Sequence, residues 1–150
     1  MRHFFYCDTV GRIGSVGLLV LRLVMGVAFL FHGWPKIQNP WGWMGPSAPV
    51  PAIFQALAAV AEFGGGMALI AGLLTRLASL GILSNMVVAL AMVHVPHGDP
   101  FVGKPGGRSY ELAAIYLACA VVLLVLGPGL ASLDALLFHQ PPETKPLEAS

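Results

Sequence analysis

Four long runs of apolar residues alternate with polar segments rich in proline and glycine. The runs cover about residues 13–31, 52–74, 77–93 and 112–127. Each approaches the ~20 residues that an α-helix needs to cross the hydrocarbon core of a bilayer. The charged outer faces that a soluble helical bundle requires are missing. The pattern therefore predicts an all-α, four-helix transmembrane bundle, because backbone polar groups in lipid must be satisfied within each segment.

The segments between the runs predict how the helices are connected. Residues 34–51 contain five prolines and all three tryptophans, a composition that opposes helix and places aromatic rings at the level of the lipid headgroups. Residues 94–111 form a second long connection, also rich in proline and glycine. Thr75 and Arg76 leave room only for a tight turn, so the second and third helices should be antiparallel neighbours. Both long loops then lie on one membrane face and both termini on the other.

Small residues and helix caps add detail to this fold. In the second run, alanine and glycine recur at spacings of three and four, which predicts a smooth seam for another helix, at Ala58, Ala61, Gly65, Ala68 and Gly72. After the last run, Gly-Pro-Gly at 127–129 ends the helix, and Ser132 can cap a short amphipathic segment that carries leucines. We expect one membrane domain over residues 1–138 and a short disordered tail over residues 139–150.

Composition supports the membrane assignment and removes several alternatives. Hydrophobic residues make up 57% of the chain and charged residues 10%, with a mean hydropathy of +0.78, so lipids are the expected surroundings. A net charge of +1 without a cluster of Lys or Arg offers no surface for nucleic acid. The segment GDPFVGK has the spacing of a phosphate-binding loop, but Pro105 stands where that loop needs Ser or Thr, so we reject nucleotide binding. His94 and His97 with Asp99 are weak candidates for a metal site, because a proline lies between the two histidines and no further ligand is convincing.

Basic residues predict the orientation of the bundle. The side of the termini has four of them and the long loops have three, namely Arg2, Arg12, Arg76 and Lys145 against Lys36, Lys104 and Arg108. Because cytoplasmic segments carry the excess of Lys and Arg, we expect the termini in the cytoplasm and the long loops outside. No A-x-A cleavage site follows the first run, so we expect it to be a retained span rather than a signal peptide.

Two charges and one amide fall inside the predicted spans. Arg22, Glu62 and Asn85 each lie about 15 Å from the long-loop end of their helix. These depths are measured from expected helix ends near Gly33, Ala52 and Val95. Because an arginine at this depth costs roughly 2.5–3.5 kcal/mol, we predict a buried polar cluster in which Arg22 pairs with Glu62 and Asn85 satisfies the remaining hydrogen bonds. The pair is either structural, fixing helix register, or a site for a polar headgroup or a proton.

A second set of polar residues lies near the long-loop ends of the helices. The candidate ligand-binding residues are His32, Lys36, His94, Tyr110 and Glu111. Their concentration in one half of the bundle predicts a cavity open to the long-loop side, where a histidine can donate to an anion or to a quinone carbonyl. We expect Tyr110 and Glu111 to lie beside His32 and Lys36 at its mouth. The alternative is that these side chains anchor the protein among the headgroups.

Four stretches of the chain together resemble the DoxX family. They are FHGWPK at 31–36, AEFGGGMALIAGLLTR at 61–76, GDPFVGKPGGRSYELAAIYL at 98–117 and GPGLASLDALL at 127–137. The resemblance covers about residues 15–138 and implies a four-helix protein of the bacterial cytoplasmic membrane. It also implies a relationship to the membrane subunit of a thiosulfate:quinone oxidoreductase, and an association with other membrane or peripheral protein subunits.

Three kinds of function follow from these observations. The first is a redox-linked subunit that binds a quinone or a small sulfur species on its long-loop side. The second is a non-catalytic anchor or accessory subunit of a larger membrane complex. The third is a small transporter or proton-conducting bundle that uses Arg22 and Glu62. The resemblance favours the first, with a quinone as the candidate cofactor, and the residue pattern alone identifies no catalytic residue.

Overall fold

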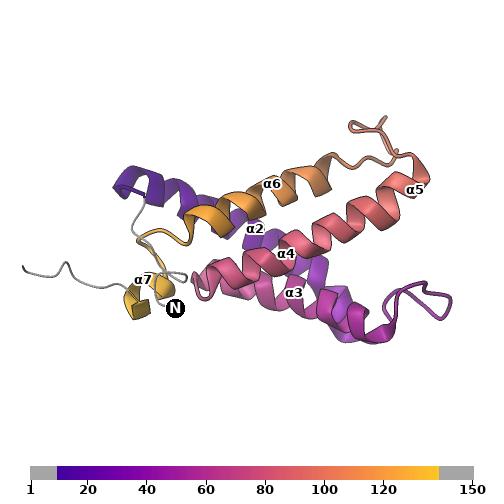
Figure 1. The fold of residues 1–150 in the computed structure, drawn as a ribbon, viewed down its shortest axis with the longest axis horizontal. Coiled ribbons are helices and arrows are strands. Elements are labelled where there is room, and N and C mark those ends of the chain that lie inside the picture. The colour runs from indigo at the N-terminus through magenta and orange to yellow at the C-terminus, as the bar shows by residue number, and fades with distance from the viewer. Residues whose placement is uncertain (1–9, 139–150) are drawn as a thin grey trace, which may run out of the picture.

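Three long apolar helices and one shorter helix make up most of the part of the chain that the structure describes. The computed structural model describes residues 10–138, and every regular element in that range is helical, so the all-α prediction is confirmed there. The four main helices are α2 (Arg12–Gln38), α3 (Ala52–Ala71), α4 (Thr75–Ala89) and α6 (Glu111–Leu126), as Figure 1 shows. The expected tail, residues 139–150, lies outside the described residues.

Three short elements extend or follow the main helices. A turn of π-helix, η1 (Leu90–His94), and the short α5 (Val95–His97) continue α4 without a break. The last element is α7 (Leu133–Phe138), which comes after α6. Helix α2, helix α3 and the continuous helix Thr75–His97 are each long and apolar enough to cross a membrane. Helix α6 has 16 residues and a length of about 24 Å, which is shorter than a typical hydrocarbon core.

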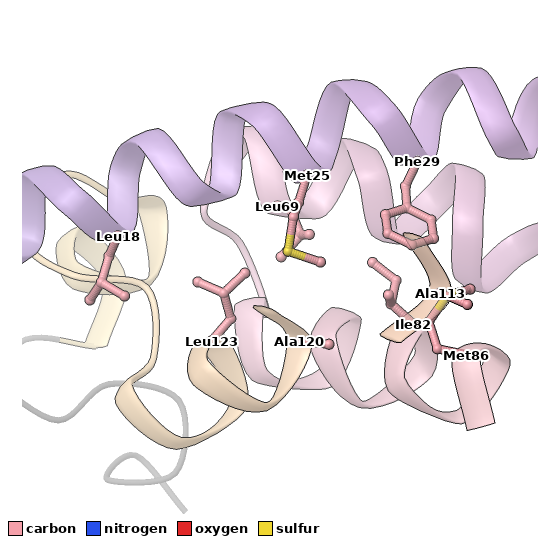
Figure 2. Close-up of a cluster of buried hydrophobic side chains, with 9 residues drawn as sticks. All are labelled: Leu18, Met25, Phe29, Leu69, Ile82, Met86, Ala113, Ala120 and Leu123. Carbon is pink, nitrogen blue, oxygen red and sulfur yellow. The ribbon is translucent and has the colours of Figure 1, made fainter. Parts of the chain in front are cut away.

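The helices pack in the order α2, α3, α4 and α6, and α6 returns to α2 through a much looser contact. Side chains from all four helices meet in one buried core, shown in Figure 2, made of Leu18, Met25, Phe29, Leu69, Ile82, Met86, Ala113, Ala120 and Leu123. The outer surface is also strongly apolar, with exposed fractions of 64% for Val24 and 76% for Phe31. An apolar exterior around so small a core is the surface expected of a protein solvated by lipid.

Glycines bring α2 and α3 into backbone contact. A Cβ atom at Gly66 would lie 2.8 Å from the carbonyl oxygen of Gly26, and a Cβ atom at Gly33 would lie 2.4 Å from the backbone nitrogen of Phe63. Neither position therefore accepts a larger residue without a shift of the helices. These two contacts fix the register of the antiparallel pair, and they place the end of α2 beside the middle of α3.

The predicted turn and seam between the second and third helices are confirmed. Helix α3 ends at Gly72, which has a φ of 65°, and α4 begins at Thr75. The seam faces α4 at Gly65 and Ala61, because a Cβ at Gly65 would lie 3.4 Å from Ile82 and a Cβ at Gly81 would lie 3.3 Å from Ala61. The small residues thus allow α3 and α4 to pack closely as antiparallel neighbours.

The prediction that helix ends before Trp34 is wrong. Helix α2 continues through Pro35 to Gln38. Proline removes one backbone hydrogen bond, but here it lies in the last turns of the helix, where tertiary contacts hold the chain. The Trp34 ring lies 5.8 Å from that of Phe63, and the ammonium of Lys36 is bonded to α3. These contacts give α2 an additional turn beyond the expected end.

Candidate functional site

Three helices converge on the carboxylate of Glu62. This side chain lies in the middle of α3 and is 5% exposed. Its Oε1 atom accepts a hydrogen bond of 2.5 Å from the Lys36 ammonium at the end of α2. Asn85 of α4 donates to the Ala58 carbonyl at 3.1 Å, and its amide nitrogen also lies 3.5 Å from Oε1. The second carboxylate oxygen, Oε2, is buried and has no hydrogen-bond partner among residues 10–138.

The tryptophan-rich loop is fixed beside this carboxylate. Trp43 places its ring 4.5 Å from the Lys36 ammonium, in a cation–π contact, and donates from Nε1 to the Gln55 carbonyl at 3.0 Å. The buried side chain of Gln55 accepts from the Met44 N–H at 3.1 Å and donates to the Val50 carbonyl at 2.9 Å. Gln55 therefore holds the loop against the start of α3.

The predicted ion pair between Arg22 and Glu62 is wrong. Arg22 is fully buried, but its guanidinium donates to the Ala131 carbonyl, and the charge that acts on it is that of Asp134. The extension of α2 explains the difference, since Arg22 lies about 24 Å from the helix end at Gln38 while Glu62 lies about 15 Å from the start of α3. The two charges are at different levels of the bundle, and Lys36 takes the position opposite Glu62.

Arg22 instead belongs to a buried cluster at the end of the bundle opposite the long loops, called the terminal end, and its Nε and Nη1 atoms have no hydrogen-bond partner among residues 10–138. The buried Asp134 carboxylate accepts from the backbone N–H groups of Leu74 at 2.7 Å and Thr75 at 2.9 Å, at the start of α4. The Asp134 N–H donates to the Gly72 carbonyl at 2.9 Å. This aspartate therefore joins α7 to the turn between α3 and α4 and provides a negative charge near the arginine.

The predicted helix cap at Ser132 is confirmed. Its hydroxyl oxygen accepts from the Ala135 N–H at 3.0 Å, and the hydroxyl donates to the Gly129 carbonyl at 2.8 Å. These bonds order the connection between α6 and α7. They also place Ala131, whose carbonyl accepts from Arg22, over the end of the bundle.

The five residues expected at the long-loop mouth form their hydrogen bonds with partners outside this set. No hydrogen bond or ion pair in residues 10–138 joins any two of His32, Lys36, His94, Tyr110 and Glu111. The His32 ring packs 5.9 Å from that of Tyr116 on α6, and the Tyr110 ring lies 5.3 Å from that of Phe101. Glu111 begins α6. A shared cavity for these residues stays a prediction.

Asp99 organises the second long loop, a role that the sequence pattern did not indicate. Its Oδ2 atom lies 2.8 Å from His94 Nδ1 and accepts from Arg108 Nε at 3.2 Å. Desolvation raises the pKa of the Asp99 carboxyl, but the hydrogen bonds from His94 and Arg108 outweigh this effect, and the net pKa is below the ordinary value of 3.8. The carboxylate thus holds the end of η1 to the loop that leads into α6.

Apolar helices that pack through glycines and bury charged groups define a small integral membrane protein. The family model for DoxX matches residues 17–95, which is more than half of the chain. The chain therefore belongs to the DoxX family.

Curated relatives match along most of the chain. The inner membrane protein YqjF of Escherichia coli is 28% identical over 128 residues, which is 84% of this chain and 95% of that protein. The putative oxidoreductase CatD of Bacillus subtilis is 28% identical over 126 residues, or 83% of this chain and 89% of that protein. An uncharacterized membrane protein of Mycobacterium tuberculosis is 32% identical over 133 residues, or 81% of each chain. No solved structure gives a significant match.

Proposed function

We propose that this protein is a redox-linked membrane subunit that binds a quinone, or a small sulfur species, at the long-loop end of its bundle. The observation that supports this function is the incomplete hydrogen bonding of the Glu62 carboxylate. Buried polar atoms are almost always hydrogen-bonded, and Oε2 of Glu62 is the buried carboxylate oxygen of residues 10–138 that has no partner. We therefore place the ligand beside Oε2 of Glu62.

The groups around Glu62 suit the head group of a quinone. Lys36 and Asn85 carry N–H donors for a carbonyl oxygen, and the free oxygen of Glu62 can accept from a hydroxyl. Trp43 adds an aromatic ring beside the ammonium. A relative named as a putative oxidoreductase supports a redox link. Partner subunits in the membrane or at its surface would complete such a system.

The structure removes the basis of one alternative function and leaves the other open to a binding test. The hypothesis of a proton-conducting bundle required Arg22 and Glu62 to act together. These residues belong to separate clusters, so the structure does not support it. A non-catalytic accessory subunit needs no ligand at Glu62, so a binding measurement separates it from the proposed function.

Quenching of Trp43 fluorescence tests the proposal. Changing Trp34 and Trp41 to Phe leaves Trp43 as the single tryptophan, 4.5 Å from the Lys36 ammonium. In nanodiscs, a short-chain ubiquinone or menaquinone analogue should quench this fluorescence saturably, and a fatty alcohol of equal length should not. Lys36→Met should weaken binding about tenfold or more, since it removes a charged donor.

The matched control is Lys104→Met, which removes a lysine of the other long loop. It should bind the analogue as the parent does. If quenching grows linearly with quinone concentration, or if both lysine variants behave alike, there is no specific site at Glu62. The accessory function would then be the better explanation.

We also propose that α6 forms a fourth span and that both long loops lie outside the cytoplasm. On a background without cysteine, Ser47→Cys should react with an impermeant thiol reagent in intact spheroplasts. Leu136→Cys, in the exposed part of α7 at the opposite end of the bundle, should react only after lysis (Figure 1). The reverse pattern would invert the orientation, and labelling of both in intact cells would argue against an even number of spans.

A further inference from the structure

Three rings from α2 and α6 form an aromatic cluster at the looser contact between these helices. The centroids of the His32 and Tyr116 rings are 5.9 Å apart, and their planes meet at 82°. Phe29 lies beside both, with its centroid 6.0 Å from that of His32 and 4.9 Å from that of Tyr116. All three rings come from helices, and of the three the His32 side chain is exposed on the surface of the bundle.

The hydrogen bond of His32 determines which of its nitrogens is open. Nδ1 lies 2.8 Å from the Ala28 carbonyl oxygen one turn earlier in α2. A carbonyl oxygen only accepts, so Nδ1 carries the hydrogen, and in the neutral ring Nε2 carries the lone pair. Nε2 makes no hydrogen bond within residues 10–138, and the side chain is exposed. His32 therefore presents an acceptor at the surface between α2 and α6.

Tyr116 presents the complementary group. Its hydroxyl makes no hydrogen bond to any residue of the described range, and the side chain is only half-buried. Apart from Glu111 at its start, helix α6 is strongly apolar, so a hydroxyl without a partner there is unfavourable unless another molecule satisfies it. An acceptor and a donor thus lie on neighbouring rings and are not bonded to each other.

We propose that Phe29, His32 and Tyr116 form a binding site for a phenol, that is, an aromatic ring bearing a hydroxyl group. The phenolic O–H donates to His32 Nε2, and the phenolic oxygen accepts from the Tyr116 hydroxyl. The ligand ring packs against that of Tyr116, which buried Phe29 supports from the core side. A phenyl ether or a quinone carbonyl has no hydrogen to donate to Nε2, so the site selects the hydroxyl form. This site goes beyond the proposed function, because it requires neither Lys36 nor Glu62.

Nitrogen-15 NMR of histidine-labelled protein in nanodiscs tests this proposal. The probes are 4-butylphenol and 4-butylanisole, which share a ring and a tail and differ in the hydroxyl hydrogen. The Nε2 resonance of His32, identified by its loss in His32→Gln, should shift saturably with 4-butylphenol and stay in place with 4-butylanisole. Tyr116→Phe keeps the ring and should weaken the binding of 4-butylphenol about three- to tenfold, which is the size expected for one hydrogen bond.

Tyr110→Phe is the matched control, because Tyr110 packs on Phe101 outside the cluster. It should bind 4-butylphenol with unchanged affinity. Melting temperatures of the two tyrosine variants, which both keep the aromatic ring, should show that both are folded. An equal shift with both probes, an unmoved His32 resonance, or an unchanged affinity of folded Tyr116→Phe would each overturn the proposal. None of these outcomes depends on quinone binding at Glu62.

Discussion

Each end of the bundle has a pair of opposite charges: Lys36 and Glu62 form an ion pair, whereas Asp134 acts on Arg22 through its nearby charge without bonding to it. At the terminal end, Arg22 and Asp134 are both fully buried, and both carboxylate oxygens accept backbone N–H groups, while Nε and Nη1 of Arg22 have no hydrogen-bond partner among residues 10–138. At the long-loop end, Lys36 is 22% exposed, and one oxygen of Glu62 has no partner in the described chain. The first pair is built into the fold, whereas the second leaves an atom available to a ligand.

The difference follows from what each carboxylate joins. Asp134 connects α7 to the start of α4, so its removal would free two segments that are distant in the sequence. Glu62 meets the flexible end of a lysine, which can turn toward water if the carboxylate is neutralised. The Asp134 carboxylate is therefore held by the backbone, whereas the Glu62 carboxylate depends on side chains that can move.

Breaking the terminal pair should have the largest effect on stability. Asp134→Ala removes the carboxylate whose charge acts on buried Arg22 and leaves the N–H groups of Leu74 and Thr75 without an acceptor. We expect a loss of about 3–5 kcal/mol, as for other buried charges that lose a partner. Melting in detergent, followed by circular dichroism, measures it. Asp134→Asn keeps one acceptor oxygen and should be intermediate, and equal melting temperatures for Asp134→Ala and the parent would show that the cluster is not structural.

The register that keeps the two pairs apart depends on the glycine contacts of α2 and α3. Gly66→Ala places a Cβ atom 2.8 Å from the Gly26 carbonyl oxygen and should cost about 1–3 kcal/mol through overpacking. Gly64→Ala is the matched control, because its nearest neighbour would be 3.8 Å away on the same helix. Similar melting temperatures for the two variants would contradict the close contact.

The apolar runs were sufficient to predict the helices and their neighbours, because burial in lipid leaves few alternatives to helix. The tight turn at Thr75 and the cap at Ser132 were also predictable, since both depend on local residues. The partners of the charged residues could not be predicted from the sequence. They depend on the register of α2, and a proline that normally ends a helix lies inside one here.

The contacts of Asp134 were also beyond what the sequence pattern could predict. It is the first acidic residue after the last apolar run, but nothing near it indicates that it reaches back to the turn at Leu74. A contact between residues so far apart depends on the whole bundle, and local propensity carries no information about it. Tyr116 was not predicted as a site residue for a similar reason. A tyrosine among apolar residues is normally interpreted as a core residue, and only the structure shows that its hydroxyl has no partner in the described range.

Neutralising the long-loop pair should have a smaller effect on stability than breaking the terminal pair. Glu62→Gln keeps the shape of the side chain and allows Lys36 to turn toward the headgroups, so we expect a loss of about 1 kcal/mol. Emission from Trp43 should change as the ammonium moves, because the ring and Lys36 are in contact. Glu111→Gln is the control and should leave both properties as they are. A loss as large as that of Asp134→Ala would mean that both pairs are structural.

The smallest effect should come from the Asp99 contacts at the surface of the long-loop end, and it should depend on pH. The pKa of the Asp99 carboxyl is lower in the folded protein than its ordinary value of 3.8, because His94 and Arg108 stabilise the charged form against desolvation. Stability from this group is therefore present above pH 3.8 and is lost as the pH falls through the folded value. The melting temperature of the parent should exceed that of Asp99→Asn at neutral pH, and the gap should close only below about pH 4. The gap should be modest, since Arg108 is 55% exposed and solvent screens the pair. A gap that stayed constant down to pH 3 would show that the charge of Asp99 does not hold the loop, and that the backbone bond from its N–H to the His94 carbonyl is sufficient.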